Sequence, residues 1–226
     1  MKIIELKETI TASNDRDAEV LREELREKGT LLINLMASPG AGKTTLLERT
    51  IRDMKDEMRI AVMEADVDSD VDAVRIEKIG AKAVQAHTDG MCHMDAGMTR
   101  RALEGLGDEK FDLVVLENVG NLICPAEFDT GAGKCVMLLS VPEGDDKPLK
   151  YPLMFSVSDV LIITKTDVAP YFDFDFDACV ERARKLNPNI RIFAVSAKTG
   201  EGFHAWEDWL RCAVADWKHE PSITQE

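Results

Sequence analysis

The stretch from Leu31 to Leu47 constrains the fold of this chain more than any other part of the sequence. An apolar run from Leu31 to Met36 leads into six mostly small residues, ASPGAG, and the chain continues as KTTLL. This order predicts a buried strand, a tight loop and the first turn of a helix. Such a unit forms a phosphate cradle, because its backbone N–H groups point inward and the positive end of the helix dipole attracts an anion.

The loop departs in one letter from the common G-x-x-x-x-G-K-[ST] spelling, since Ala37 occupies the first glycine position. Lys43 is expected to reach the β- and γ-phosphates of a nucleotide, and the Thr44 hydroxyl is expected to hold Mg²⁺. The simpler alternative is a glycine-containing turn before an ordinary helix. The strand before the loop and the helix after it favour phosphate binding, and the predicted residues are Gly40, Ala41, Gly42, Lys43, Thr44 and Thr45.

The length and charge of the chain limit its partners. Its length predicts one domain over residues 1–226, with about residues 1–29 as a short N-terminal arm and helix. The net charge of −14 disfavours nucleic acid and anionic membranes. The sequence shows neither a signal peptide nor an apolar run of the ~20 residues that span a bilayer, so we expect a cytoplasmic protein. Its five cysteines are then expected to be free thiols.

Apolar segments alternate with helical patterns along the chain. This alternation predicts an α/β fold, a P-loop NTPase with a mainly parallel sheet and helices on both faces. Besides the stretch described above, the expected strands are residues 60–65, 82–86, 111–117, 136–141, 160–164 and 191–195. The expected helices are residues 43–57, 72–79, 95–106, 175–186 and 202–217.

The first residues are expected to contribute an arm and one helix. Residues 1–12 are interpreted as a short strand or arm. A helix is expected from Asn14 to Lys28, with Ser13 or Asn14 as its N-cap and Gly29 as its stop. Apolar residues three and four apart give this helix one buried face.

Ligands of a parallel α/β sheet bind beyond the carboxyl ends of its strands, and acidic residues stand at two of these ends. Asp66 follows residues 60–65 and is a candidate Mg²⁺ ligand, although a solvated acidic turn explains the same residues. Glu117 ends another strand and is expected to hold Mg²⁺ through water, while Gly120 is expected to donate its N–H to a γ-phosphate. The predicted catalytic residues are Lys43, Asp66 and Glu117.

Two further strand ends predict a site for a purine base. The segment TKTD at residues 164–167 resembles the N-K-x-D element of GTPases, whose aspartate accepts the N–H donors of guanine while the lysine stem covers the ring. Because Thr164 replaces asparagine, the sequence predicts the loss of the amide that ties this loop to the phosphate loop. The segment SAK at residues 196–198 resembles an element whose backbone supports the guanine carbonyl. A charged loop is the alternative, but the order of the elements favours GTP, with Lys165, Asp167, Ser196, Ala197 and Lys198 at the base.

Cysteine and histidine residues suggest a second site. Cys92 and His93 are adjacent in a loop before a predicted helix, and Cys124 lies in the segment after Glu117 that would respond to a γ-phosphate. Thiolate and imidazole ligands suit Zn²⁺ and Ni²⁺, so these three residues are candidate metal ligands, with ordinary packing as the alternative. Cys135 is the spare candidate. Two cysteines within helix patterns are expected in the core, Cys179 and Cys212.

Five segments carry a resemblance to a known family: NLMASPGAGKTTLLERT, DAVRIEKIGAKAVQ, GMCHMDAGM, ENVGNLICPAEFD and LLSVPEGDDKPLKYP. From about Asn14 to Trp217 the sequence resembles the hydrogenase nickel-incorporation GTPases, the HypB family. The resemblance implies a GTPase of the SIMIBI class that acts as a homodimer and helps to insert nickel into the [NiFe]-hydrogenase active site. It also implies a HypA-type nickel metallochaperone as partner and, indirectly, the hydrogenase large subunit.

The resemblance also implies which residues bind metals. In that family a nickel or zinc ion lies at the dimer interface, and the matching ligands here are Cys92, His93 and Cys124. The implied magnesium ligands are Thr44, Asp66, Asp72 and Glu117. Some family members carry a histidine-rich stretch or an N-terminal cysteine motif that binds nickel. This sequence has neither, since its first cysteine is Cys92, so we do not expect nickel storage.

The combined elements predict a nucleotide-dependent switch. GTP and Mg²⁺ are expected to order the loop after Glu117 and to place Cys124 beside Cys92 and His93, and hydrolysis to GDP is expected to relax it. Hydrolysis is expected to be slow, because no catalytic glutamine or arginine finger is visible. Three alternatives stay open: a related maturation GTPase such as one serving urease, a nucleotide-dependent scaffold with structural zinc, and an ATPase with buried thiols.

Overall fold

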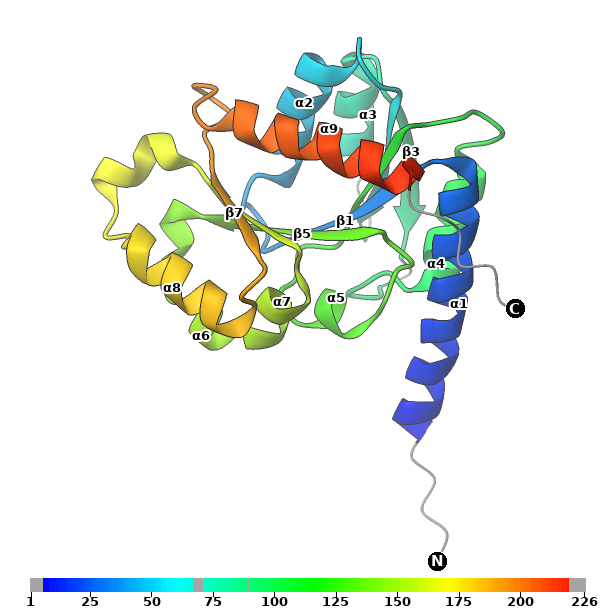
Figure 1. The fold of residues 1–226 in the computed structure, drawn as a ribbon, viewed down its shortest axis with the longest axis horizontal. Helices are drawn as coiled ribbons and strands as arrows, with labels where there is room; N and C mark the ends of the chain where they lie inside the picture. Colours follow the sequence, from blue (N-terminus) through cyan, green and yellow to red (C-terminus); the bar gives the residue numbers. More distant parts are fainter. Residues whose placement is uncertain (1–5, 67–70, 89, 220–226) are drawn as a thin grey trace, which may run out of the picture.

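A computed structural model describes residues 6–66, 71–88 and 90–219, except for the side chains of residues 6–10, 66 and 71–73. Within these residues, seven strands pair in parallel to form one sheet of order β3-β2-β4-β1-β5-β6-β7 (Figure 1). The predicted α/β fold with a parallel sheet is confirmed. The strands are β1 Leu31–Ala37, β2 Ile60–Asp66, β3 Lys82–His87, β4 Leu113–Glu117, β5 Lys134–Ser140, β6 Val160–Thr164 and β7 Arg191–Ala194.

Helices cover both faces of the sheet. In Figure 1, α9 lies with α2 and α3 on one side, and α5 to α8 lie on the other, while α1 and α4 pack together at one end. The long helices are α1 Leu6–Lys28, α2 Lys43–Met54, α3 Val71–Lys78, α4 Ala96–Gly105, α8 Phe176–Leu186 and α9 Phe203–His219. The short ones are α5 Cys124–Glu127, α6 Lys147–Lys150 and α7 Pro152–Val157, with 3₁₀ turns η1 Val141–Glu143 and η2 Thr166–Tyr171.

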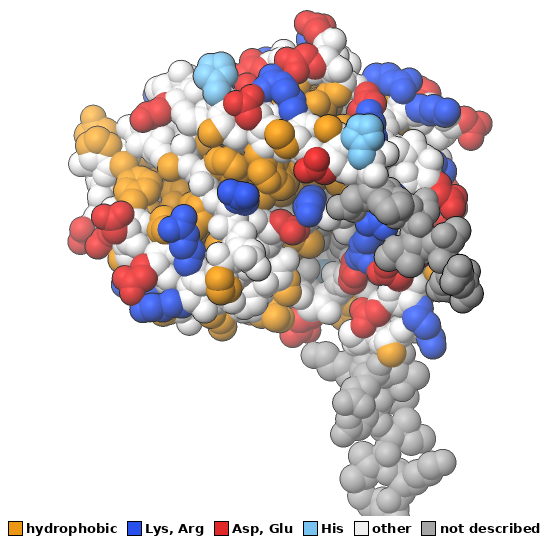
Figure 2. Space-filling view, in the orientation of Figure 1, with side chains coloured by type: hydrophobic (Ala, Val, Ile, Leu, Met, Phe, Trp, Pro, Cys, Tyr) orange, Lys and Arg blue, Asp and Glu red, His pale blue; other side chains and the backbone are white. Residues whose placement is uncertain are grey.

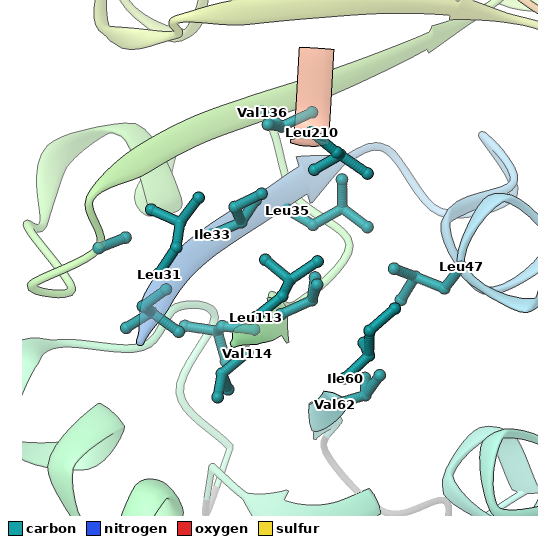
Figure 3. Packing of buried hydrophobic residues seen from close by; sticks show 14 of the residues in the cluster. Leu31, Ile33, Leu35, Leu47, Ile60, Val62, Leu113, Val114, Val136 and Leu210 are labelled. Carbon is teal, nitrogen blue, oxygen red and sulfur yellow. The ribbon is translucent and has the colours of Figure 1, made fainter. Parts of the chain in front are cut away.

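The buried side chains divide between two cores, one on each face of the sheet. In β5, Val136 and Leu138 pack into the core that includes α2 and α9, whereas Met137 and Leu139 pack into the core that includes α7 and α8. Successive side chains of a strand point to opposite faces, so strands covered on both faces are apolar throughout. Figure 3 shows the first core around β1, with the labelled side chains Leu31, Ile33, Leu35, Val136 and Leu210. Each fully buried leucine or isoleucine contributes about 1.5–3 kcal/mol, which fixes the strands that carry the site.

The order of the strands places the ligand crevice. β1 lies between β4 and β5, so the strands that follow in the sequence lie on opposite sides of it. Such a point of reversal leaves room for a ligand beyond the carboxyl ends of the central strands. The loops that follow β1, β4 and β6 therefore meet at one edge of the sheet.

The N-terminal helix differs from the prediction. α1 begins at Leu6 and not at Asn14, so the expected N-cap at Ser13 or Asn14 is wrong. Asn14 stands inside the helix, because its side chain bonds to Asp129 and Ala96 elsewhere in the fold instead of to its own backbone. Residues 1–5 of the expected arm lie outside the described residues.

Acidic and basic side chains are mixed on the surface of the molecule. Among the described residues on the face seen in Figure 2, acidic side chains are interspersed with lysine and arginine, and they do not gather into one patch. In the part of the chain that the structure describes, no helix combines the length and apolarity needed to cross a bilayer.

Candidate functional site

The loop between β1 and α2 has the backbone shape of a phosphate cradle. Gly42 precedes α2 with φ 101°, and Gly40 has φ 76°, a left-handed region that favours glycine. Lys43 is the first residue of α2, so the loop lies at the positive end of this helix dipole. Ala37 is the last, buried residue of β1 and is paired with Leu138, so its strand backbone does not require glycine.

Glu117 connects the phosphate loop to β4. Its buried carboxylate accepts a hydrogen bond from the Thr44 hydroxyl at 3.1 Å, and its Oε1 lies 3.9 Å from Lys43 Nζ. Hydroxyl and carboxylate oxygens are the ligand types that Mg²⁺ takes, so the donors fit this ion. Glu64 in β2 is paired in register with Glu117 and is a second buried carboxyl group, which was not predicted from the sequence. The sequence feature that could have indicated Glu64 is an acidic residue inside an otherwise apolar strand.

Gly120 lies directly against the phosphate loop. A Cβ atom at this position would stand 3.0 Å from Pro39 Cγ and 3.2 Å from the Pro39 nitrogen. Just before it, the Asn118 amide donates to Asn34 Oδ1 at 3.0 Å, and the Asn118 N–H donates to the Leu35 carbonyl. The segment after β4 is therefore held against β1 and the loop, which is where a γ-phosphate contact requires it.

Two of the predicted acids cannot be placed as ligands. Asp66 ends β2 and Asp72 lies in α3, but their side chains are outside the described residues. The rest of the acidic turn, residues 67–70, also lies outside them. Roles for both residues at Mg²⁺ stay predictions.

A cavity of about 230 Å³ opens beside the phosphate loop. Its wall comes from the loop and the start of α2, from the segment after β6 and from the segment after β7. The lining residues include Ala41, Gly42, Thr45, Lys165, Asp167, Ala197 and Lys198. The structure thus brings together most residues that the sequence predicted for a base. Ser196 is the exception, because it is fully buried and does not line the cavity.

Asp167 is oriented from behind the cavity. The Ser196 hydroxyl donates to Asp167 Oδ1 at 2.8 Å and accepts a hydrogen bond from the Thr199 N–H. One carboxylate oxygen is thereby fixed, and the carboxylate faces the cavity that Lys165 also lines. A carboxylate held in this way can accept two N–H donors from the edge of a base.

The predicted loss of the tie between the base loop and the phosphate loop is wrong. The Thr164 hydroxyl, on a residue only 5 % exposed, donates to the Ala41 carbonyl at 2.7 Å. Lys165 adds a second tie, since its Nζ donates to the Gly40 carbonyl at 2.6 Å. Lys165 itself has φ 60°, in the left-handed region that residues other than glycine rarely adopt. A threonine at position 164 therefore replaces the asparagine amide with a shorter donor.

We expect Thr164→Val to lower the free energy of unfolding by about 1–3 kcal/mol, because the buried Ala41 carbonyl loses its donor. Urea unfolding measures this change. Thr166→Val is the matched control, since the described residues offer the buried Thr166 hydroxyl no hydrogen-bond partner. An equal loss of stability in Thr166→Val would contradict the assignment of the effect to the tie.

The three candidate metal ligands come together on two neighbouring loops. Cys92 Sγ lies 3.8 Å from His93 Nδ1, and a hydrogen bond with the Cys124 thiol, followed by burial, raises the pKa of the Cys92 thiol. His93 is 7 % exposed and stacks on Phe128, with ring centroids 3.9 Å apart. Burial lowers the pKa of His93 more than the nearby carboxylates of Asp95 and Glu127 raise it. A neutral imidazole is the form that binds a metal.

The described residues of one chain do not by themselves complete a metal site. Among the described residues, no group of three or more histidine, cysteine or acidic side chains is arranged to hold an ion. Cys92 is exposed and Cys124 is partly exposed, so both can be reached from outside the chain. Two soft thiols and one imidazole fit nickel or zinc by donor type and require further ligands for four-coordination.

The remaining cysteines do not join this cluster. All five cysteines are free thiols, as predicted. Cys135 is partly exposed as a residue, but its thiol is buried, which raises its pKa to about 12. The nearby carboxylates of Asp159 and Asp129 raise this pKa further, and the cations of Arg22 and Lys134 lower it. Cys179 is fully buried in α8, as predicted. Cys212 is exposed on α9, so its predicted core position is wrong.

These environments predict different thiol reactivities at pH 8. We expect iodoacetamide to modify Cys212 rapidly and Cys179 only after unfolding, because burial raises the pKa of the Cys179 thiol to about 12 and blocks access. Peptide mass spectrometry after timed alkylation measures both rates. In urea the two thiols should react alike, and equal rates in the native protein would refute the prediction.

One short segment joins the two sites. It runs from Glu117, past Gly120, to Cys124 at the start of α5. The Asn121 side chain accepts the Ile123 N–H at 2.8 Å, a local turn that leads the chain into α5. Sequence reasoning missed α5 because four residues show no periodicity, and it missed Phe128 because spacing gives no sign of a ring stacked on His93.

Comparisons with known proteins show the family to which the chain belongs. The family described as CobW/HypB/UreG, nucleotide-binding domain, matches residues 31–194. The hydrogenase maturation factor HypB of Rhizobium leguminosarum bv. viciae is 44% identical over 214 residues, covering 95% of this chain and 72% of that protein. The crystal structure of HypB from Helicobacter pylori in complex with nickel has a TM-score of 0.86 and 38% identity, covering 95% of this chain and 99% of that one. HypB from Archaeoglobus fulgidus gives a TM-score of 0.84 at 41% identity, covering 90% of this chain and 99% of that one. The chain therefore belongs to the CobW/HypB/UreG family of nucleotide-binding proteins and, within it, to the HypB hydrogenase maturation factors.

Proposed function

We propose that this chain is a GTP-hydrolysing nickel metallochaperone for [NiFe]-hydrogenase, in which metal binding is coupled to nucleotide-dependent dimerisation. One observation carries the proposal: a single short segment joins Glu117, which contacts the phosphate loop, to Cys124, which contacts Cys92. The relatives support it, since they are named hydrogenase maturation factors and one was solved in complex with nickel. The proposal treats residues 1–226 as one P-loop GTPase domain in the cytoplasm, where thiols stay reduced.

In this proposal the chain positions the phosphates and neutralises their charge. The amides between Gly40 and Thr44 cradle the phosphate oxygens, and Lys43 Nζ lies against the terminal ones. Glu117 and the Thr44 hydroxyl supply oxygen ligands for Mg²⁺, which when bound stabilises the charge that develops on the phosphates. Asp167 and the Lys165 stem hold guanine in the cavity of about 230 Å³. Turnover is slow, because positioning alone does the catalysis.

The switch couples the two sites through the segment after β4. With GTP, the Gly120 N–H bonds to the γ-phosphate and fixes the start of the segment that carries Cys124. With GDP this contact is lost, and the Cys124 thiol moves relative to Cys92. A tenfold change in nickel affinity requires only about 1.4 kcal/mol of differential contact. The coupling is reciprocal, so nickel also changes nucleotide affinity.

A second copy of the chain completes the metal site in this proposal. The three candidate ligands of one chain leave a four-coordinate ion short of a ligand, and the exposed Cys92 can reach an ion shared between two copies. Nickel is the cargo of the site, and zinc accepts the same ligands. A HypA-type metallochaperone is the proposed partner that exchanges nickel with the dimer.

A relative suggests a second target. The Helicobacter pylori protein that is 40% identical over 213 residues is named a hydrogenase/urease maturation factor. Nickel delivery to urease is therefore the second candidate function of the same site. Activation of nickel-free hydrogenase and of nickel-free urease by the loaded protein separates the two candidates.

Metal titrations in three nucleotide states test the proposal. Ni²⁺ and Zn²⁺ affinities are measured in the apo, GDP and GTP-analogue states, with the mass of the assembly read in each. We expect the GTP analogue to favour the dimer and to change nickel affinity by about tenfold. Equal nickel affinity in all three nucleotide states would contradict the proposed switch. Tight zinc binding that ignores nucleotide would instead indicate a structural site, and ATP competing as well as GTP would indicate an ATPase.

Nickel affinity should also rise with pH between about 6 and 8. The hydrogen bond from Cys124 and burial raise the pKa of the Cys92 thiol, so this thiol is protonated at neutral pH and loses its proton when it binds the ion. Release of one proton gives about a tenfold gain in affinity for each pH unit. Titrations in buffers of equal ionic strength measure the slope, and a flat profile would exclude Cys92 as a thiolate ligand.

A further inference from the structure

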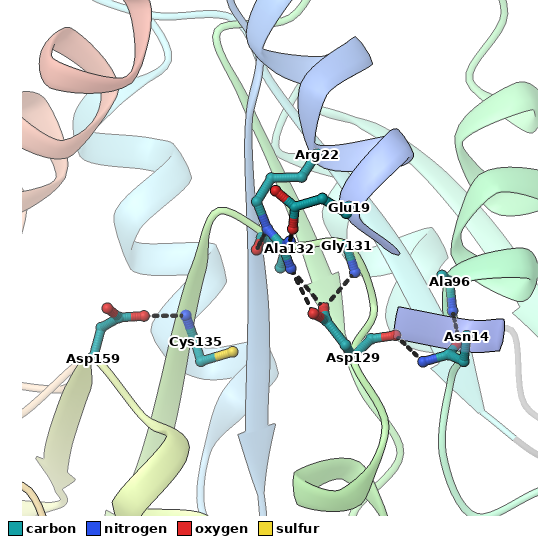
Figure 4. Close-up of polar contacts among 9 residues, drawn as sticks. All are labelled: Asn14, Glu19, Arg22, Ala96, Asp129, Gly131, Ala132, Cys135 and Asp159. Carbon is teal, nitrogen blue, oxygen red and sulfur yellow. Dashed lines mark hydrogen bonds and ion pairs between the residues drawn. The ribbon is translucent and has the colours of Figure 1, made fainter. Parts of the chain in front are cut away.

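The side chain of Asn14 bridges two segments that are distant in the sequence. Asn14 lies inside α1 and is only 9 % exposed. Its Nδ2 donates to the Asp129 carbonyl at 2.9 Å, and its Oδ1 accepts the Ala96 N–H at 2.9 Å (Figure 4). The amide nitrogen of Asn14 thus bonds to one segment, and its amide oxygen bonds to the other.

The two bridged segments are those that carry the candidate metal ligands. Ala96 is the first residue of α4, which follows Cys92 and His93, and the N-cap of that helix is closed by Asp95. Asp129 follows α5, whose first residue is Cys124. Between the anchors, His93 stacks on Phe128, the residue before Asp129.

Further contacts fix the Asp129 side of the bridge to the same helix. Arg22 of α1 donates through Nη2 to both Asp129 carboxylate oxygens, at 2.8 and 2.6 Å, and through Nε to the Ala132 carbonyl at 3.1 Å (Figure 4). Gly131 has φ 77°, and a Cβ there would stand 2.8 Å from Leu21 Cδ2 of α1. The loop after α5 therefore lies tightly against α1, and its position follows that of the helix.

We infer that Asn14 is a positioning residue for the metal site: it sets the distance between the loop of Cys92 and His93 and the loop of Cys124. The inference rests on the proposed function, because it assigns Asn14 to the geometry of the same three ligands. Both hydrogen bonds of the Asn14 amide go to backbone groups, of Ala96 and Asp129, so we infer that it acts on the ligands through these two backbones.

The physical reason is that a metal site tolerates little error in the positions of its ligands. Groups that orient the ligands from outside change metal affinity by about 10–100-fold when they are removed. Asn14 holds both ligand-bearing loops with one rigid amide, so its loss lets each loop move independently. The nucleotide residues are attached to β1, β4 and β6 and do not depend on this amide.

Two substitutions of Asn14 distinguish the loss of the bridge from a loss of stability at the start of α4. Asn14→Ala removes both hydrogen bonds, whereas Asn14→Asp keeps an acceptor for the Ala96 N–H and removes the donor to Asp129. Glu24→Gln is the matched control, because it breaks the ion pair of Glu24 with Arg100 at the same α1–α4 contact without touching Asp129. Unfolding midpoints verify that each protein is folded.

Ni²⁺ titration of the full chain, followed by the thiolate-to-nickel absorption band, is the first measurement. We expect both Asn14 variants to bind Ni²⁺ about tenfold more weakly with a shifted band, while Glu24→Gln and the affinity for a GTP analogue stay unchanged. Unchanged affinity and band in Asn14→Ala would overturn the inference. An equal loss of Ni²⁺ affinity in Glu24→Gln would also overturn it. The same holds if Asn14→Ala loses Ni²⁺ affinity and Asn14→Asp does not.

A second measurement does not depend on metal binding. Mild diamide oxidation converts the Cys92 and Cys124 thiols to a disulfide, with diamide taking up the two electrons and two protons, and mass spectrometry measures the rate. We expect the Asn14 variants to form this disulfide several-fold more slowly than wild type and Glu24→Gln, because the two loops drift apart. If the wild type binds no Ni²⁺, the proposed function fails, and this rate alone decides whether Asn14 positions the loops.

Discussion

Lys43→Ala is expected to lower GTP affinity by roughly two to three orders of magnitude. The Lys43 ammonium is the first side chain of α2 and is proposed to contact two phosphates, and a hydrogen bond to a charged group contributes about 1.5–3 kcal/mol. Its loss also removes the ammonium group, now 3.9 Å from the Glu117 carboxylate, that offsets the repulsion between this carboxylate and the negatively charged phosphates. Isothermal titration with a GTP analogue measures the change.

Lys55→Ala provides the matched control for that experiment. Lys55 follows the other end of α2, where its Nζ donates to the Ile79 carbonyl at 3.2 Å. The control carries the same change in net charge without touching the phosphate loop, so its affinity should equal that of wild type. If Lys43→Ala bound GTP as tightly as Lys55→Ala, the loop after β1 would not be a nucleotide site.

Cys124→Ala is expected to reduce nickel affinity by roughly two to three orders of magnitude. A structural zinc site with four ligands is worth about 10–16 kcal/mol, so one ligand accounts for about 2.5–4 kcal/mol. The same substitution should abolish the dependence of nickel affinity on nucleotide, because Cys124 is the ligand attached to the segment that follows Glu117. Nickel titrations in the GDP and GTP-analogue states measure both effects.

Cys212→Ala is the control for the loss of a thiol, since Cys212 is exposed on α9 and has no role in the proposed site. Its nickel affinity and nucleotide dependence should match those of wild type. Unchanged metal affinity of Cys124→Ala in every nucleotide state would remove Cys124 from the site. If nickel affinity falls equally in the GDP and GTP-analogue states, Cys124 is a metal ligand but the proposed switch is wrong.

The phosphate loop and the sheet were predictable because local sequence determines them. A run such as Leu31 to Met36 is buried on both faces wherever it lies in a parallel sheet, and Gly42 with Lys43 fixes the start of the next helix. The N-K-x-D-like and S-A-K segments each follow such a strand. Their side chains therefore had to meet at the carboxyl edge, and the cavity lined by Lys165, Asp167 and Lys198 confirms that they do.

Two predictions failed because a side chain has its partner elsewhere in the fold. Asn14 was interpreted as a helix cap because asparagine caps helices locally, yet its amide bonds to Ala96 and Asp129, and the helix continues through it. Thr164 was expected to lose a tie that asparagine makes, yet its hydroxyl reaches the Ala41 carbonyl. In both cases the residue type gave the capacity to bond, and only the fold supplied the partner.

The sequence by itself determined the order of the strands and the long helices, the loops of the nucleotide-binding fold and the identity of three candidate metal ligands, because propensity, burial and backbone shape act over a few residues. Only the tertiary structure decided that Cys124 contacts Cys92, that His93 stacks on Phe128 and that α1 bridges both ligand loops. These contacts join segments far apart in the chain. The distance between such segments depends on the packing of the whole molecule and not on the residue types within each segment.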